Sequence, residues 1–104
     1  KSIGQEQPFA TDVADPDLLR QILADQADHV ARRLRRGGLR ARTVTLKLRY
    51  GDFTTLTRST TRPDPTDLSD DLRTMAADLL SAWARQAFGP LRLLGVTASV
   101  RRGP

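Results

Sequence analysis

The stretch ARTVTLKLRYGDFTTLTRSTT, residues 41–61, decides how this 104-residue chain folds. From residue 43 to residue 50, apolar side chains alternate with polar ones, which is the period of a half-buried strand. Gly51 and Asp52 favour a turn, and residues 53–61 are rich in threonine, whose β-branched side chain suits strands better than helices. The stretch therefore predicts a β-hairpin with one face packed on a core and the other face in water.

The length of the hairpin turn decides which side chains share a face. A two-residue turn places Arg58 and Thr60 on the polar face with Lys47, and this is the register that we predict. The same register leaves Leu56 on the polar face, where an apolar side chain is out of place. A bulge or a three-residue loop would move Leu56 to the core and carry Arg58 with it, because a shift of one residue exchanges the two faces of a strand.

A helix is expected on each side of the hairpin. Asp15 is a suitable N-cap and Pro16 a suitable first helical residue, and apolar residues then recur every three or four positions, so we place a helix at 16–36. A second helix is predicted to begin near Thr66, which offers a hydroxyl cap, and to stop before Gly89. Each helix has one apolar stripe, which must be buried against the sheet.

Two more strands complete the predicted sheet. Residues 91–100 alternate as the hairpin does, and residues 5–9 suit a short strand that Pro8 restricts to an edge. The element order is then strand, helix, strand, strand, helix, strand. This order predicts an α+β fold, in which a four-stranded antiparallel or mixed sheet has both helices packed on one face and the other face open. A chain of 104 residues can form one such core without a metal or a disulfide.

Charge is sorted by segment along the chain. Residues 32–62 hold ten Lys and Arg against a single Asp, whereas residues 10–28 and 64–78 each hold five Asp against one Arg. If the acidic segments are helices and the basic one is mostly strand, the fold has one positive face, which suits a polyanionic partner. Cysteine is absent, and so is any run of about 20 apolar residues, so we expect no disulfide, no membrane partner and a cytoplasmic protein.

No residue pattern points to catalysis or to a metal. His29 is the only histidine and has no second ligand at a useful spacing, so we assign it to the surface of the first helix. Asp70 and Asp71 are adjacent and therefore point about 100° apart on a helix, which suits neither a catalytic pair nor a metal site. Trp83 and Met75 fall on the apolar stripe of the second helix and are assigned to the core. We expect no enzyme activity from this chain by itself.

The polar side of the predicted sheet is the candidate binding site. Short hydroxyl side chains next to backbone N–H groups suit phosphate oxygens better than base edges. Thr and Ser are also ordinary residues for the wet side of an antiparallel sheet, and that interpretation stays open. Aromatic residues are few, which disfavours stacking on single-stranded bases. The residues concerned are Thr43, Thr45, Lys47, Gly95, Thr97 and Ser99.

Three segments of the chain resemble one known family. Residues 33–53, 57–59 and 92–96 are similar in sequence, order and spacing to the C-terminal little-finger domain of Y-family translesion DNA polymerases, the DNA polymerase IV branch in particular. Residues 1–6 resemble the linker that joins the family's thumb domain to the little finger. We therefore divide the chain into a linker at 1–4, the little-finger domain at 5–101 and a tail at 102–104.

The resemblance implies sequence-independent binding of a primer-template duplex through its backbone phosphates, as part of DNA damage bypass. The implied partners are that duplex, the rest of a polymerase chain and, as the alternative function, a sliding clamp or other polymerase domains that the chain would dock against. The family's catalytic carboxylates and its Mg²⁺ belong to the palm domain, which has no counterpart here. This piece is therefore expected to need no cofactor and to bind DNA without polymerising it.

The family's DNA-contact regions carry over to this sequence position by position. Some relatives have basic side chains where Leu93 and Thr97 stand, so this chain is expected to hold DNA less strongly. The matching positions are Ser2, Gly4, Arg42, Thr43, Thr45, Lys47, Arg58, Thr60, Arg92, Gly95, Thr97 and Ser99.

Overall fold

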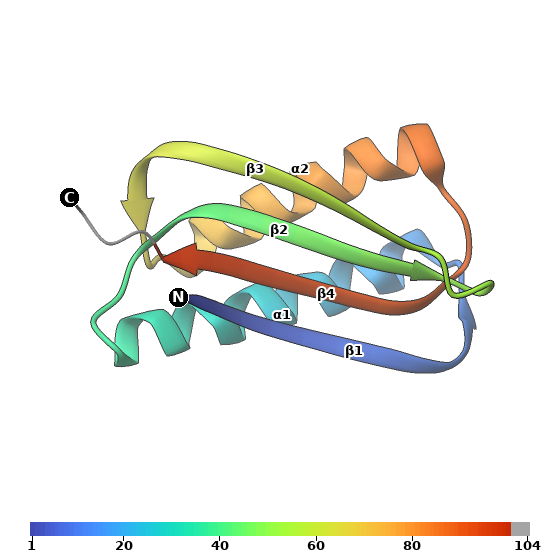
Figure 1. Ribbon diagram of the computed structural model, residues 1–104, viewed down its shortest axis with the longest axis horizontal. Coiled ribbons are helices and arrows are strands. Elements are labelled where there is room, and N and C mark those ends of the chain that lie inside the picture. The colour runs from blue at the N-terminus through green and yellow to red at the C-terminus, as the bar shows by residue number, and fades with distance from the viewer. Residues whose placement is uncertain (101–104) are drawn as a thin grey trace.

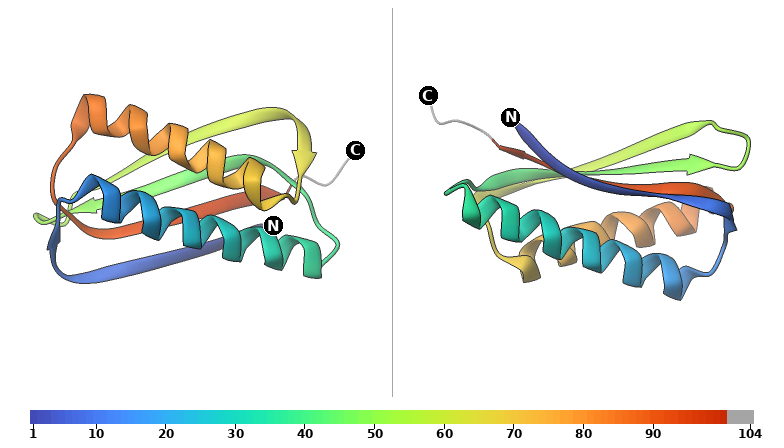
Figure 2. Two further views of the ribbon diagram at one scale, coloured as in Figure 1. Left: turned by 180° about the vertical axis from the view of Figure 1, so that it is seen from behind. Right: turned by 90° about the horizontal axis from the view of Figure 1, so that it is seen from below.

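Four antiparallel strands lie side by side in the order β1-β4-β2-β3 in the computed structural model, which describes residues 1–100 (Figure 1). Both helices pack on one face of this sheet and leave the other face uncovered, as the view along the sheet in Figure 2 shows. The predicted α+β architecture and element order are confirmed. The predicted tail at 102–104, together with Arg101, lies outside the described residues. The elements are β1 (Ser2–Val13), α1 (Pro16–Arg36), β2 (Ala41–Tyr50), β3 (Thr55–Thr66), α2 (Ser69–Ala87) and β4 (Leu91–Val100).

The first strand, β1, is longer than the strand predicted at 5–9. It begins at Ser2, which pairs with Ser99 of β4, so residues expected to belong to a linker contribute to the sheet. Pro8 is tolerated because β1 is an edge strand, as predicted, and needs no N–H on its outer side. Past Pro8 the pairing with β4 is irregular until Val13.

Helix α1 begins where the sequence predicts and for the predicted reason. The Asp15 carboxylate accepts hydrogen bonds from the backbone N–H groups of Asp17 (3.0 Å) and Leu18 (3.4 Å). Pro16 occupies the first helical position, where its missing N–H costs nothing. The helix ends at Gly37, its C-cap.

Helix α2 begins at Ser69, and the predicted cap is displaced from it. Leu68 occupies the N-cap position and forms no side-chain capping bond. The buried Thr66 hydroxyl instead accepts a hydrogen bond from the Leu68 N–H (3.1 Å) and donates one to the Asp71 carboxylate (2.6 Å). Thr66 thus holds the turn from β3 into α2 without being the helix cap.

The hydrophobic core fills the space between the sheet and the helices. Leu46 and Leu48 of β2 and Leu94 of β4 are fully buried there. Burial of each such side chain stabilises the fold by roughly 1.5–3 kcal/mol. Trp83 is 1% exposed and Met75 packs against the same core, so the assignment of both residues to the core is confirmed.

The water-facing sides of the helices are mostly polar, with Leu18 of α1 (43% exposed) as an exception. His29 is exposed on α1, as predicted. Neither α1 nor α2 is apolar enough along its length to cross a membrane. Within residues 1–100, His, Asp and Glu side chains do not gather in a group of three that could hold a metal ion.

The β2–β3 hairpin has a three-residue loop. The Tyr50 N–H donates to the Thr54 carbonyl (2.9 Å) and the Phe53 N–H donates to the Tyr50 carbonyl (2.9 Å), so the loop consists of Gly51, Asp52 and Phe53. Phe53 has a φ of 69°, the left-handed conformation that commonly closes a loop of this length. The Asp52 carboxylate supports the loop by accepting hydrogen bonds from the Thr54 N–H (3.0 Å) and hydroxyl (2.6 Å).

The loop length reverses the predicted faces of β3. Leu56 lies opposite Leu48, and Arg58 lies opposite Leu46, on the side of the sheet that the helices cover. Thr60 has the same orientation. The prediction that Arg58 and Thr60 face outward is therefore wrong, because the third loop residue shifts β3 by one position relative to β2. The alternative of a three-residue loop, which moves Leu56 to the core side, is the one that the protein adopts.

Candidate nucleic-acid interface

The uncovered side of the sheet, here called the open face, consists of four rows that run across all four strands. Each row takes one residue from β1, β4, β2 and β3 in that order, because strand pairing aligns them side by side. The rows are Ser2, Ser99, Thr43, Thr61; then Gly4, Thr97, Thr45, Ser59; then Glu6, Gly95, Lys47, Thr57; and finally Pro8, Leu93, Arg49, Thr55.

The first two rows are almost entirely hydroxyl side chains. The Thr43 and Thr61 hydroxyls lie 2.8 Å apart, and so do those of Thr45 and Ser59, so each pair shares one hydrogen bond across β2 and β3. A hydroxyl has one donor and two acceptor positions, so each pair keeps a donor and acceptors for a ligand. These rows bring together half of the twelve predicted site residues, and they add Ser59 and Thr61 of β3, which the predicted register had turned to the core.

Gly4 gives the second row its close packing. A Cβ atom at this position would lie 2.8 Å from the Thr97 hydroxyl oxygen, closer than van der Waals contact permits. The hydroxyl of Thr97 therefore occupies the space that a side chain on residue 4 would need.

The third row contains a carboxylate that the sequence-based site lacked. Glu6 Oε1 lies 3.5 Å from Lys47 Nζ, and the Glu6 side chain crosses Gly95 to reach it. A Cβ atom on Gly95 would lie 2.8 Å from the Glu6 Cβ. The absence of a side chain at residue 95 is thus required by the position of Glu6. The two-residue period from Gly4 would have placed Glu6 on this face had the first strand been predicted to its full length.

The fourth row and its surroundings form the end of the open face next to the hairpin loop. Arg49 lies on the face and donates from Nε to the Thr55 hydroxyl (3.1 Å), although it was absent from the predicted site. Arg92 lies at the rim, where Nε donates to the Phe9 carbonyl (3.2 Å) and the guanidinium carbon lies 5.9 Å from the centre of the Phe53 ring. Leu93 belongs to this row but is only 5% exposed, so it offers almost no surface to a ligand.

Arg42 lies at the opposite end of the face. The pairing of β2 is irregular between Ala41 and Thr43, and Arg42 donates from Nε to the Arg62 carbonyl (3.2 Å). With Thr43 and Ser99 it lines a shallow hollow of about 220 Å³. This hollow joins a guanidinium to the first hydroxyl row.

The basic residues of the segment 32–62 do not gather on the open face, so the prediction that they form one positive face is wrong. Its four rows hold Lys47 and Arg49 against Glu6. Much of the remaining positive charge lies in the last turn of α1, where Arg35 donates to the Asp67 carbonyl (2.7 Å). Arg58 donates to the Thr57 carbonyl (3.0 Å) from the helix-covered side. Tertiary structure thus distributes the charge along the length of the molecule instead of sorting it by face.

An acidic side chain neutralises one of these arginines. Asp71 Oδ2 lies 2.6 Å from Arg62 Nη1. The Thr66 hydroxyl, and after it the Arg62 guanidinium, hold the pKa of Asp71 below its usual value. Asp71 is therefore ionised at neutral pH, and Arg62 is engaged in an ion pair.

The impB/mucB/samB family C-terminal domain matches residues 1–100. The chain belongs to this family. The DNA polymerase IV of Methanoculleus marisnigri is 45% identical over 103 residues, covering 99% of this chain and 28% of that protein. The DNA polymerase IV of Halorhodospira halophila is 43% identical over 99 residues, covering 95% of this chain and 28% of that protein.

Solved structures share the fold of this impB/mucB/samB family member. The complex of beta-clamp processivity factor and the little finger domain of PolIV superimposes with a TM-score of 0.76 at 21% identity, covering 100% of this chain and 92% of that one. The insertion ternary complex of Dbh DNA polymerase superimposes with a TM-score of 0.81 at 15% identity, covering 96% of this chain and 28% of that one. The predicted resemblance to the little-finger domain of the DNA polymerase IV branch is confirmed. The chain spans 28% of the length of the two polymerase relatives.

Proposed function

We propose that this domain binds duplex DNA without sequence preference, holding a primer-template by its backbone phosphates on the open face. The observation that carries the proposal is a sheet face left uncovered by the helices, with two hydroxyl rows next to Lys47 and Arg49. Hydroxyl, guanidinium and ammonium groups are the donors that proteins direct at phosphates, and such contacts contain no sequence information. The names of the relatives support the same function.

The small number of cations on the open face sets the expected salt dependence. Lys47 and Arg49 lie on the face, and Arg42 and Arg92 lie at its two ends, so three or four phosphates are the most that these residues would neutralise. Each neutralised phosphate contributes about −0.9 to the slope of log affinity against log salt. Affinity should therefore fall roughly 40- to 150-fold between 50 and 200 mM salt.

The rest of the protein is part of the proposal. We propose that the complete chain is a translesion DNA polymerase of the DNA polymerase IV type, because the relatives that match this piece are so named. Catalytic carboxylates and their Mg²⁺ would then lie in another domain. The piece described here would position DNA, and synthesis by it alone is not expected.

Arginines on the two faces of the same hairpin provide a matched test. Arg49→Ala removes a cation from the open face, and Arg58→Ala removes one from the helix-covered face. Fluorescence anisotropy with a labelled hairpin duplex should show about fivefold weaker binding for Arg49→Ala, with a salt slope smaller by about 1. Arg58→Ala should bind as the unchanged domain does. Equal losses for both variants, or binding that does not respond to salt, would contradict the proposal.

Docking to a sliding clamp is the second candidate function. It is supported by the solved complex of beta-clamp processivity factor with a little finger domain, whose fold this chain shares. A pull-down with purified clamp should separate the two functions when it is repeated with the double variant Lys47→Ala, Arg49→Ala. Clamp binding should survive while DNA binding weakens. Loss of both together would mean that the open face itself serves the clamp.

A further inference from the structure

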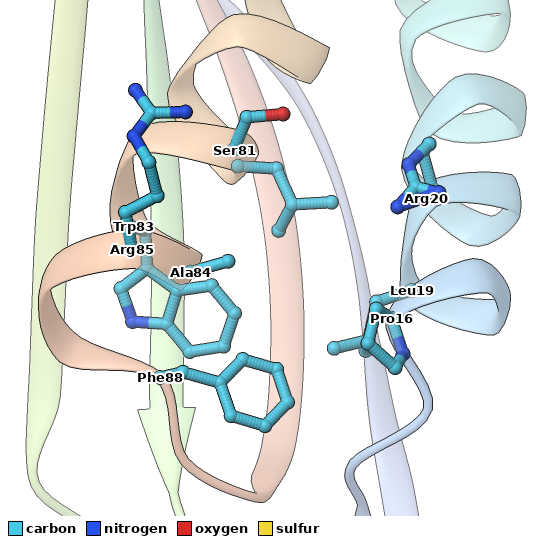
Figure 3. Close-up of a pocket in the computed structure, with 9 residues that line it drawn as sticks. Pro16, Leu19, Arg20, Ser81, Trp83, Ala84, Arg85 and Phe88 are labelled. Atoms are coloured by element: carbon cyan, nitrogen blue, oxygen red, sulfur yellow. The ribbon is translucent and has the colours of Figure 1, made fainter.

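The helix layer contains an apolar groove on the side of the molecule away from the open face. It lies between the first turn of α1 and the last turns of α2 and has a volume of about 250 Å³ (Figure 3). We call it the helix groove. Its walls and floor consist of Leu19 of α1 together with Trp83, Ala84 and Phe88 at the C-terminal end of α2. Phe88 is 43% exposed, so a large aromatic ring meets water at the mouth of the groove.

The floor of the helix groove is held in place by hydrogen bonds. The Trp83 indole N–H donates to the Tyr50 hydroxyl (2.8 Å), and that hydroxyl donates to the Ala87 carbonyl (2.8 Å) at the end of α2. The centres of the Trp83 and Phe88 rings lie 5.2 Å apart, so the two rings pack together along one wall of the groove. The groove therefore exists before any ligand arrives, so a ligand would not need to order it.

The rim of the groove is basic. Arg20 of α1 and Arg85 of α2 line it from opposite sides. Arg20 lies 2.9 Å from Asp17, whose side chain is 90% exposed, so this pair is weak and open to exchange. Arg85 is exposed and forms no ion pair with any residue in the described range 1–100. An anionic group next to the groove would find a cation that has no competing partner.

From this arrangement we infer that the helix groove docks a peptide segment of a protein partner in which one large apolar side chain lies next to a carboxylate. The apolar side chain enters between Leu19 and Phe88, and the carboxylate meets Arg85 at the rim. Charge complementarity selects an acidic segment over a basic or neutral one. Because the groove and the open face lie on opposite sides of the sheet, the domain can hold this partner and a duplex at the same time.

Blocked synthetic peptides test the inference directly. The probe is acetyl-Asp-Gly-Phe-Gly-Asp-amide with a fluorescent label, and its controls replace both aspartates by asparagine or the phenylalanine by alanine. Trp83 is the only tryptophan in the chain, so its emission gives a second, label-free readout from the groove wall. We expect the acidic peptide to bind about fivefold more tightly than the asparagine peptide, and the alanine peptide not to bind.

Two protein variants locate the binding. Arg85→Glu should weaken the acidic peptide about tenfold, because an attractive pair becomes a repulsive one. Arg36→Glu is the matched control, since it also reverses an exposed arginine in the last turn of a helix but lies far from the groove. Ser81→Phe should fill the groove from its exposed rim and abolish binding, with circular dichroism to verify that the fold is kept.

Three results would contradict peptide docking in the helix groove. Equal binding of the aspartate and asparagine peptides, equal losses in Arg85→Glu and Arg36→Glu, or no binding at about 1 mM peptide would overturn it. Self-association that Ser81→Phe abolishes would assign the groove to a second copy of the chain instead. A saturating duplex should leave peptide binding unchanged, so failure here and failure of DNA binding on the open face can be told apart.

Discussion

The two faces of the sheet are made from alternate residues of the same strands, yet they have opposite chemistry. In β2, Leu46 and Leu48 are fully buried under the helices, while the alternating residues Thr45 and Lys47 are only half-buried on the open face. The helix-covered face excludes water and stabilises the fold, and the open face keeps its polar groups available. This difference shows that a single strand can serve stability and binding together, because its side chains alternate.

Strand β3 shows how easily that division is changed. One additional loop residue turns Leu56 toward the helices and Thr57 toward the open face. The same residue moves Arg58 away from the candidate site. A sheet face is therefore defined by turn length as much as by the alternation within the strand.

The largest expected difference between the faces is in stability. Leu46→Ala leaves a cavity in the core and should lower the free energy of unfolding by about 2–5 kcal/mol. Thr45→Ala, one residue away on the open face, should cost less than about 1 kcal/mol. Urea denaturation followed by circular dichroism measures both, and similar losses would mean that the open face is also packed.

Gly95 tests how closely β1 lies against β4 on the open face. Gly95→Ala places a Cβ 2.8 Å from the Glu6 Cβ, so the strands must separate, and stability should fall by about 1–3 kcal/mol. Glu6→Gly removes the obstructing atom. The double variant should therefore be more stable than the sum of the two single losses predicts, a coupling that thermal unfolding of all four proteins would reveal.

Glu6 also opposes a polyanion on the open face. Glu6→Gln removes the negative charge 3.5 Å from the Lys47 ammonium, and we expect duplex affinity to rise about threefold at low salt. Asp25→Asn makes the same charge change on exposed α1, behind the sheet, and should have little effect. If both variants strengthen binding equally, net charge and not the open face controls affinity.

Removing one threonine hydroxyl from each face compares their contributions to duplex binding without changing any charge. Thr61→Val removes a hydroxyl from the first row of the open face, and Thr60→Val removes one from the opposite side with the same change of shape. Duplex affinity should fall about twofold for Thr61→Val, because one phosphate donor is lost. Affinity that stays the same for Thr61→Val and drops for Thr60→Val would reverse the assignment of faces.

The smallest expected effect is the response of the β3–α2 junction to acid. The pKa of Asp71 is lowered in the folded protein, first by the Thr66 hydroxyl and then by Arg62, so this carboxylate stabilises the fold above the unfolded pKa near 3.8. That contribution is lost as the pH falls through the lower, folded value. Asp71→Asn should therefore reduce the difference in stability between pH 7 and pH 3. Asp52→Asn should act in the same direction, since Thr54 lowers the pKa of Asp52 in the hairpin loop.

Most of the fold could be predicted from local patterns, and most of the site followed from the fold. Alternation in residues 43–50 and 91–100, with the Asp15-Pro16 helix start, was enough to assign the layers and the open face. Arg49, Glu6 and the hydroxyls of β3 were missed. The faces of Glu6 and of the β3 hydroxyls depended on where a strand begins and how long a loop is, which local sequence determines weakly. Arg49 depended on neither, because the alternation in β2 already places it on the same face as Lys47.

The sequence by itself determined which residues are apolar and with what period they recur, and those two properties set the element types and the side of each strand that is buried. Only the tertiary structure decided the register of β3, the meeting of Glu6 with Lys47 over Gly95, and the distribution of arginines along the molecule. The physical reason is the separation along the chain of the residues that interact. Periodicity acts between residues a few positions apart, whereas register and charge placement arise from contacts between segments that are distant in the chain.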